Sequence, residues 1–147
     1  MRIEIGDGYP DEVVIRCSAI GEEVLALQKL IREGVKHAPQ LCLTKGDAEY
    51  YVDPSSILFF ETEGNTVMAH TADNAFEAGM KLYELESLLG ATFQRISKSA
   101  VVNTKAIWSI ARGLSGAGAI SFRGTHKQVY VSRAYYKQLK EKLEETR

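Results

Sequence analysis

The sequence predicts an α+β fold that is mainly β, with antiparallel strands and a few short helices. Short runs in which apolar and polar residues alternate recur from Gln40 onward, as in half-buried strands. Glycine, asparagine and aspartate separate these runs and predict tight turns. Apolar residues at helical spacing are confined to a few segments. We therefore expect a main domain at residues 39–147, preceded by a β-β-α extension at residues 1–38.

The extension begins with two predicted strands and ends with a predicted helix. Apolar and polar residues alternate over Ile3–Ile5 and again over Val13–Cys17. Gly21–Arg32 places apolar residues on one side of a helix, and Gly34 follows its expected end. A piece of about 35 residues is too small to hold a hydrophobic core by itself. We expect it to dock on the main domain or on a second copy of the chain.

The main domain is predicted to contain short strands joined by turns. The expected strands are Leu41–Leu43, Tyr50–Val52, Ile57–Glu61, Thr66–Thr71, a brief stretch at Phe76, Phe93–Ile96, Ala106–Arg112, Ala119–Arg123 and Val129–Val131. The glycine-rich segment Gly113–Gly118 is typical of a hairpin loop between two of them.

Three segments of the main domain favour helical structure. Met80–Leu89 carries leucines at helical spacing, and Gly90 closes it. Ser97–Val102 predicts a single helical turn. Ser132 is a good N-cap and opens a last helix that ends near Glu145, with apolar residues on one face.

The composition is that of an ordinary globular protein in a reducing compartment. The chain has 147 residues, of which 45% are hydrophobic and 25% are charged. No apolar run approaches the roughly 18 residues that suggest a membrane span, and Met1–Pro10 lacks the apolar core of a secretory signal. Cys17 and Cys42 lie far apart, which favours free thiols, with a structural disulfide as the alternative. We expect a cytoplasmic protein.

The formal net charge of −1 conceals an uneven distribution of charge along the chain. Between Ser87 and Lys140 there is no aspartate or glutamate, and the nine bases of this stretch are Arg95, Lys98, Lys105, Arg112, Arg123, Lys127, Arg133, Lys137 and Lys140. The rest of the chain has 18 − 9 = 9 bases against 19 acids, a balance of −10. A contiguous basic third favours a polyanion such as nucleic acid as partner. The alternative is that several of these bases are only solvated.

The sequence lacks the residue patterns of an enzyme or a metal centre. His37, His70 and His126 have no cysteine or second histidine at metal-ligand spacing, so we interpret His70 as a packing or surface residue. Glu61 and Glu63 share a strand face, but no second polar constellation accompanies them. The glycine-rich segment lacks the lysine and hydroxyl pair of a phosphate-binding P-loop. We predict no catalytic residues, no metal and no cofactor.

Four motifs, in order along residues 40–143, resemble those of LytTR DNA-binding domains. They are Ile57–Glu61 followed by Gly64-Asn65, Leu82–Glu86 followed by Leu88-Leu89, Phe93–Ser99 followed by Val101–Asn103, and Val129–Tyr136. Each motif alone is weak, whereas the four in this order are specific, and the chain resembles this family over most of its length.

The resemblance implies a fold of antiparallel strands in which loops, and not a recognition helix, enter successive major grooves of double-stranded DNA. The DNA-binding residues that it implies are Asn65 and Thr66 in the first loop, Arg95, Ser97 and Lys98 in the second segment, and Arg133 after the last strand. Ser97 stands where the family commonly has histidine. Thr66 is shorter than the basic residue sometimes found at its position.

The chemistry of these residues suits DNA, and each has a structural alternative. Arg133 has a planar fork that can read guanine, and the alternative is a surface ion pair. Asn65 suits adenine or a phosphate, and the alternative is a turn residue at positive φ. Lys98 suits a phosphate or a guanine, and the alternative is a solvated lysine. Arg95 could equally be structural, and we expect Asn103 to cap backbone groups and not to contact DNA.

These observations predict a sequence-specific DNA-binding transcriptional regulator that is not an enzyme. Family members commonly carry a phosphate-receiver domain, whereas only residues 1–38 precede the LytTR-like part here. The chain resembles stand-alone LytTR regulators, which implies a membrane protein that restrains it. We expect a homodimer, formed through Gly21–Arg32, on DNA with repeated half-sites. The alternatives are a protein-interaction module that uses Tyr135 and Tyr136 without DNA, and a small enzyme acting on an anionic metabolite.

Overall fold

The computed structural model describes residues 18–35 and 40–145. The chain divides into two units, Met1–Ala38 and Pro39–Arg147. The described residues of the first unit contain one helix, α1 (Glu22–Val35), as the sequence predicted. It continues through Gly34, because one glycine in a last turn costs only about 1 kcal/mol and does not by itself end a helix. The strands predicted at Ile3–Ile5 and Val13–Cys17 lie outside the described residues.

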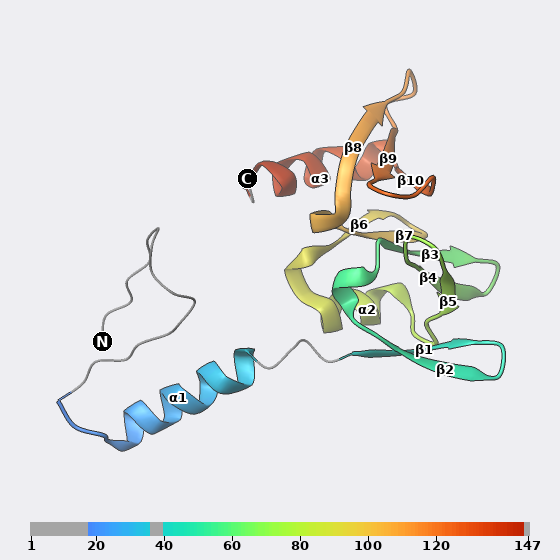
Figure 1. The fold of residues 1–147 in the computed structure, drawn as a ribbon. Helices are drawn as coiled ribbons and strands as arrows, with labels where there is room; N and C mark the ends of the chain where they lie inside the picture. Colours follow the sequence, from blue (N-terminus) through green and yellow to red (C-terminus); the bar gives the residue numbers. More distant parts are fainter. Residues whose placement is uncertain (1–17, 36–39, 146–147) are drawn as a thin grey trace. The chain divides into compact units, whose positions relative to one another are not determined.

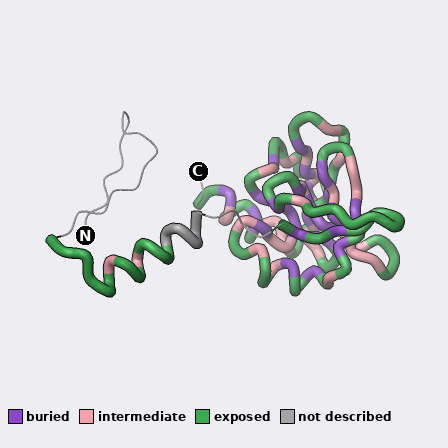
Figure 2. The backbone as a smooth tube through the Cα atoms, turned by 60° about the horizontal axis from the view of Figure 1, so that its bottom comes forward, coloured by how far each residue is buried: buried purple, intermediate pink, exposed green. Residues whose placement is uncertain are grey.

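The apolar side chains of α1 are largely exposed. The exposed fractions are 53% for Leu25 and 66% for Leu30, and Ile20 just before the helix is 78% exposed. Figure 2 shows α1 coloured as exposed along most of its described length, whereas the second unit has a buried interior. No helix in the described ranges has both the length and the apolar content needed to cross a membrane.

The second unit is built from two antiparallel sheets, which confirms the predicted mainly β class. The seven-stranded sheet has the order β2-β1-β5-β4-β3-β7-β6, and the three-stranded sheet has the order β10-β9-β8. The strands are β1 (Leu41–Lys45), β2 (Ala48–Val52), β3 (Phe59–Glu63), β4 (Thr66–His70), β5 (Ala75–Glu77), β6 (Phe93–Ser97), β7 (Ala100–Asn103), β8 (Ile107–Arg112), β9 (Gly118–Phe122) and β10 (Gln128–Val131). The helical elements are α2 (Leu82–Leu89), α3 (Arg133–Glu145) and the short η1 (Pro54–Ser56), η2 (Gly90–Thr92) and η3 (Thr104–Ala106).

The single helical turn predicted at Ser97–Val102 is wrong. Lys98 and Ser99 form a turn, and β7 then runs antiparallel to both β6 and β3. All residues of β7 are buried, so its sequence Ala-Val-Val-Asn lacks the alternation of apolar and polar residues that marks a half-buried strand.

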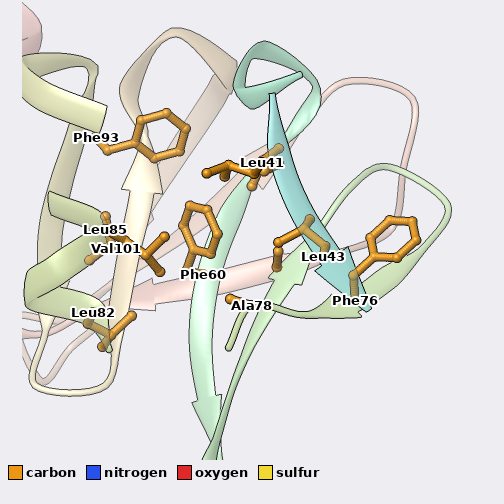
Figure 3. Close-up of a cluster of buried hydrophobic side chains, with 11 residues drawn as sticks. Leu41, Leu43, Phe60, Phe76, Ala78, Leu82, Leu85, Phe93 and Val101 are labelled. Atoms are coloured by element: carbon orange, nitrogen blue, oxygen red, sulfur yellow. The ribbon is translucent and has the colours of Figure 1, made fainter. Parts of the chain in front are cut away.

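The large sheet separates two hydrophobic core clusters. Successive residues of β3 and β7 point to opposite faces, so Phe60 and Val101 belong to one cluster and Phe59 and Val102 to the other. Helix α2 covers the first face, while α3 and the three-stranded sheet cover the second (Figure 1). Figure 3 shows the first cluster, with Phe60 at its centre and Leu85 of α2 beside it. This double layer fixes the turns at the ends of the strands.

Candidate nucleic-acid interface

The turn between β3 and β4 carries the first predicted contacts. Glu63 pairs with Thr66 across the end of this hairpin, so Gly64 and Asn65 form its turn. Gly64 has a φ of 62°, in the left-handed region that glycine adopts without steric cost. Asn65 is exposed, and no described residue other than glycine has a positive φ. The alternative that Asn65 is the left-handed turn residue is therefore wrong, and Gly64 has that role. Thr66 is only partly exposed.

The turn between β6 and β7 carries the second set of predicted contacts. Two of these residues, Arg95 and Ser97, hold the turn together. Arg95 donates from Nη1 to the backbone carbonyl of Lys98 at 3.2 Å, and its Nε lies 3.6 Å from Oε2 of Glu86 in α2. The Oγ of Ser97 accepts a hydrogen bond from the backbone N–H of Ser99 at 3.2 Å. Lys98 is exposed at the tip of the turn. Arg95 and Ser97 thus shape the turn that presents the Lys98 side chain.

The start of α3 carries the third predicted contact. Arg133 is the first residue of the helix and is exposed. The N–H of Tyr135 donates to the carbonyl of Ser132 at 3.1 Å, which closes the first turn. Among the described residues, no carboxylate forms an ion pair with Arg133. A surface ion pair, the structural alternative for this arginine, therefore finds no partner carboxylate in the described part of the chain.

Two backbone hydrogen bonds bring these three segments to one end of the large sheet. The N–H of Thr62, near the end of β3, donates to the carbonyl of Ser99 at 2.8 Å. The N–H of Ser132 donates to the carbonyl of Ile96 at 2.8 Å. Each bond joins segments more than thirty residues apart in the sequence. We call this part of the domain the loop end; it consists of the β3–β4 turn, the β6–β7 turn and the start of α3.

A fourth segment lies beside Arg133, and sequence reasoning did not assign it to the site. The loop between β8 and β9 contains Leu114, which is fully exposed, and Gly116, which lies directly against the Arg133 stem. The glycines of this loop were the available signal, but they were interpreted only as hairpin residues. Their contact with α3 depends on long-range packing, which spacing along the chain does not show.

Two basic residues of the acid-free stretch lie at the opposite end of the domain. β7 and β9 both lead away from the loop end, and Lys105 and Arg123 follow their far ends. The Arg123 guanidinium lies 3.8 Å from the centre of the Trp108 ring, a cation–π contact. Both bases line a shallow groove with Leu58 and Trp108. They provide matched exposed controls for Lys98 and Arg133.

A third base, Lys127, is engaged inside the fold. Its Nζ donates to the carbonyl of Asn74 and lies 3.3 Å from Nδ1 of His70. Because an ammonium group can only donate, His70 accepts at Nδ1 and donates from Nε2 to Oε1 of Glu63, at 3.2 Å. Burial, and secondly the charge of Lys127, lower the pKa of His70, although Glu63 opposes the shift. Burial likewise lowers the pKa of Lys127.

The polar residues that we interpret as structural from the sequence, His70 and Asn103, have a structural role. His70 stacks on Phe59 with ring centres 4.5 Å apart, which confirms it as a packing residue. Asn103 is buried, donates from Nδ2 to the carbonyl of Ile57 at 2.9 Å, and accepts at Oδ1 from the N–H of Lys105 at 3.1 Å. It caps backbone groups, as predicted. Within residues 18–35 and 40–145, no group of histidine, cysteine and acidic side chains could hold a metal ion.

Comparison with known families identifies the domain. The family model of the LytTr DNA-binding domain matches residues 47–144, which include all three segments of the loop end. The chain belongs to the LytTR family. The family is one of DNA-binding domains, which are not typically enzymatic.

Relatives and a solved structure resemble this LytTR protein over part of its length. An uncharacterized HTH-type transcriptional regulator of Staphylococcus aureus is 33% identical over 94 residues, covering 64% of this chain and 63% of the relative. Another, from a bovine strain of that organism, is 35% identical over 89 residues, covering 60% of each chain. The chain thus spans less than two thirds of the length of these relatives. The LytTr DNA-binding domain of a methyl-accepting/DNA response regulator from Bacillus cereus superposes with a TM-score of 0.66 at 22% identity, covering 71% of this chain and 96% of that one.

The relatives are named for a helix-turn-helix, which differs from the arrangement in this LytTR domain. Here α2 and α3 are separated in sequence by strands β6 to β10, and they cover opposite faces of the large sheet. The described residues of the domain therefore contain no helix-turn-helix pair.

Proposed function

We propose that this LytTR protein is a transcriptional regulator that binds double-stranded DNA in a sequence-specific manner through its loop end. The observation that carries the proposal is the pair of backbone hydrogen bonds, Thr62 to Ser99 and Ser132 to Ile96, that brings three motif segments together. The exposed side chains there include Lys98 and Arg133, and neither has a carboxylate partner among the described residues. Cations without carboxylate partners, one at the tip of a turn and one at the start of a helix, suit the phosphates and base edges of a duplex.

Each of the predicted contact residues has a distinct role in this proposal. Arg133 reads a guanine with its two-pronged guanidinium, and Lys98 binds a phosphate. Asn65 contacts a base edge or a phosphate from the first turn, with Thr66 beside it. Arg95 and Ser97 are assigned indirect roles, because their hydrogen bonds maintain the conformation of the β6–β7 turn.

The proposed regulator acts as a homodimer on repeated half-sites in the cytoplasm. The exposed apolar residues of α1, including Leu25 and Leu30, supply a surface for a second copy. By the family resemblance, the input to the proposed regulator is a membrane protein that restrains it. Co-purification of a membrane protein encoded beside this chain is the direct check of that input. An unrelated bait, washed with the same detergent, should not retain that membrane protein.

The test begins with selection of duplexes from a randomised DNA library by the purified protein. We expect enrichment of a short motif that occurs twice per bound fragment. Arg133→Ala should weaken binding to the selected duplex by about 5- to 150-fold and relax one base position. Lys98→Ala should weaken all duplexes alike and reduce the log–log salt slope by about 0.9.

Two variants at the opposite end of the domain serve as matched controls. Arg123→Ala and Lys105→Ala remove the same charges from exposed positions away from the loop end. Both should leave the selected motif unchanged and reduce affinity much less than Arg133→Ala and Lys98→Ala do. If the wild-type protein enriches no motif, or if the control variants lose as much affinity as the loop-end variants, the proposal is wrong.

A further inference from the structure

The β8–β9 loop has a fixed conformation next to the first turn of α3. The N–H of Gly113 donates to the carbonyl of Ala117 at 2.8 Å, and the N–H of Gly116 donates to the carbonyl of Gly113 at 3.2 Å. Gly116 has a φ of 87°, in the region that L side chains rarely adopt. The backbone of the loop is thus closed on itself, with Gly116 on the side that faces α3.

The aliphatic stem of Arg133 lies directly on Gly116. A Cβ atom added to this glycine would be 3.0 Å from Cδ and 3.1 Å from Cγ of Arg133, closer than ordinary carbon–carbon contact. Among the glycines whose surroundings are described, only Gly116 would bring its Cβ this close to a predicted DNA-contact residue. A methyl group at position 116 would therefore displace the arginine stem.

The hairpin and the start of α3 are also held to each other behind this contact. Gly118 lies so close to the helix that an added Cβ would be 3.0 Å from Cε2 of Tyr136. The Arg112 guanidinium lies 4.9 Å from the centre of the same tyrosine ring. The helix carrying Arg133 and the loop carrying Gly116 thus share one packed base, which keeps the glycine next to the arginine stem.

We propose that Gly116 is a positioning residue for Arg133, and that the β8–β9 loop directs the guanidinium toward the DNA. This inference rests on the proposed function of Arg133. A free arginine samples many rotamers, and binding loses that freedom. Support of the stem on Gly116 reduces this loss and limits the directions that the guanidinium takes. The loop then contributes to sequence discrimination without reading a base itself.

Two substitutions at Gly116 separate displacement of Arg133 from backbone strain. Gly116→Ala introduces both a Cβ atom and strain at positive φ, whereas Gly116→Asn introduces the same Cβ with less strain, because asparagine tolerates the left-handed region. Gly124 has a φ of 74° and no atom within 4 Å of an added Cβ. Gly124→Ala and Gly124→Asn therefore reproduce the strain without the contact. Thermal unfolding should show that the two alanine variants lose similar stability, and likewise the two asparagine variants.

The experiment measures affinity for the selected duplex and for an unrelated duplex. We expect both Gly116 variants to lose about 3- to 10-fold in affinity for the selected duplex, the cost of immobilising one arginine, with the unrelated duplex unaffected. Both Gly124 variants should bind like the wild-type protein. In the Arg133→Ala background, Gly116→Ala should cause no further loss, because the stem that it displaces is absent.

The outcomes distinguish this inference from the proposed function. If Arg133→Ala weakens specific binding but the Gly116 variants behave like the Gly124 variants, the positioning role is wrong and the proposed function stands. An equal loss from Gly116→Ala with and without Arg133 would also contradict the positioning role. If the wild-type protein does not discriminate between the two duplexes, the proposed function itself fails.

Discussion

Arg95 and Arg133 carry the same charge in the same acid-free stretch, but their surroundings differ. The Arg95 guanidinium is held by Glu86 and by the carbonyl of Lys98, and its side chain is only 24% exposed. Arg133 is exposed, and its stem rests on Gly116. The motif that contains each arginine is visible in the sequence, whereas the partner that engages its guanidinium depends on packing between distant segments.

The lowered pKa of His70 predicts a pH-dependent contribution to stability. The unfolded chain, with an ordinary histidine pKa near 6.5, binds a proton more readily than the folded domain does. The contribution is therefore present above about pH 7 and is lost as the pH falls through 6.5 toward the lower folded-state pKa. Denaturant unfolding at a series of pH values should show this loss in the wild-type domain and a smaller loss in His70→Gln. His126→Gln, at an exposed position, should retain the wild-type slope.

The buried Asn103 predicts a large stability effect without a direct effect on DNA contacts. Asn103→Ala removes both side-chain hydrogen bonds, so the carbonyl of Ile57 and the N–H of Lys105 lose their partner. We expect a loss of about 2–4 kcal/mol in the free energy of unfolding. Urea denaturation measures it, and the exposed neighbour substitution Lys105→Ala should cost less than about 0.5 kcal/mol. A near-neutral Asn103→Ala would contradict the structural role.

In the β8–β9 hairpin, neighbouring side chains pack so closely on Gly118 that they leave no room for a side chain there. A Cβ atom at Gly118 would lie 2.8 Å from Cγ2 of Ile110 and 3.0 Å from Cγ1 of Val131. Gly118→Ala should therefore destabilise the domain by about 1–3 kcal/mol through overpacking. Gly113→Ala in the same hairpin is the control, because its nearest new contact would be at 3.6 Å. Equal unfolding midpoints for the two variants would show that the stability of the domain does not depend on this close approach.

Helix α1 carries exposed apolar side chains, among them Leu25 and Leu30. We expect Leu30→Asp to shift the protein from dimer to monomer in sedimentation at tens of micromolar. Gln28→Asp places the same charge at an exposed polar position of the helix and should leave the dimer intact. A wild-type monomer under these conditions would contradict dimerisation through α1, although DNA could still assemble two copies.

Sequence reasoning predicted the elements with clear periodicity and missed the one without it. The alternation of Leu41 with Leu43 and the leucines of α2 were sufficient to place β1 and α2. β7 is buried on both faces, so its apolar run was interpreted as a helical turn. The three segments of the loop end each contain a motif that the sequence shows. The contact between the β8–β9 loop and Arg133 was missed because Arg133 follows this loop by a whole hairpin.

At the scale of the whole molecule, charge along the chain and charge in space are different quantities. Of the bases in the acid-free stretch, Lys98 and Arg133 lie at the loop end, whereas Lys105 and Arg123 lie at the opposite end and Lys127 is engaged with His70. The basic third of the sequence therefore does not form one uniform basic face. We expect the number of phosphates neutralised per protomer on binding, read from the salt slope, to be smaller than the nine bases of that stretch.

The central claim, that DNA binds at the loop end, is tested most directly by an NMR amide map of the protein with the selected duplex. The account predicts the largest shifts at Asn65, Lys98, Gly116 and Arg133. It also predicts little change in the indole resonance of Trp108, the single tryptophan, at the opposite end. Shifts concentrated around Trp108, Lys105 and Arg123, with the loop end unperturbed, would contradict it.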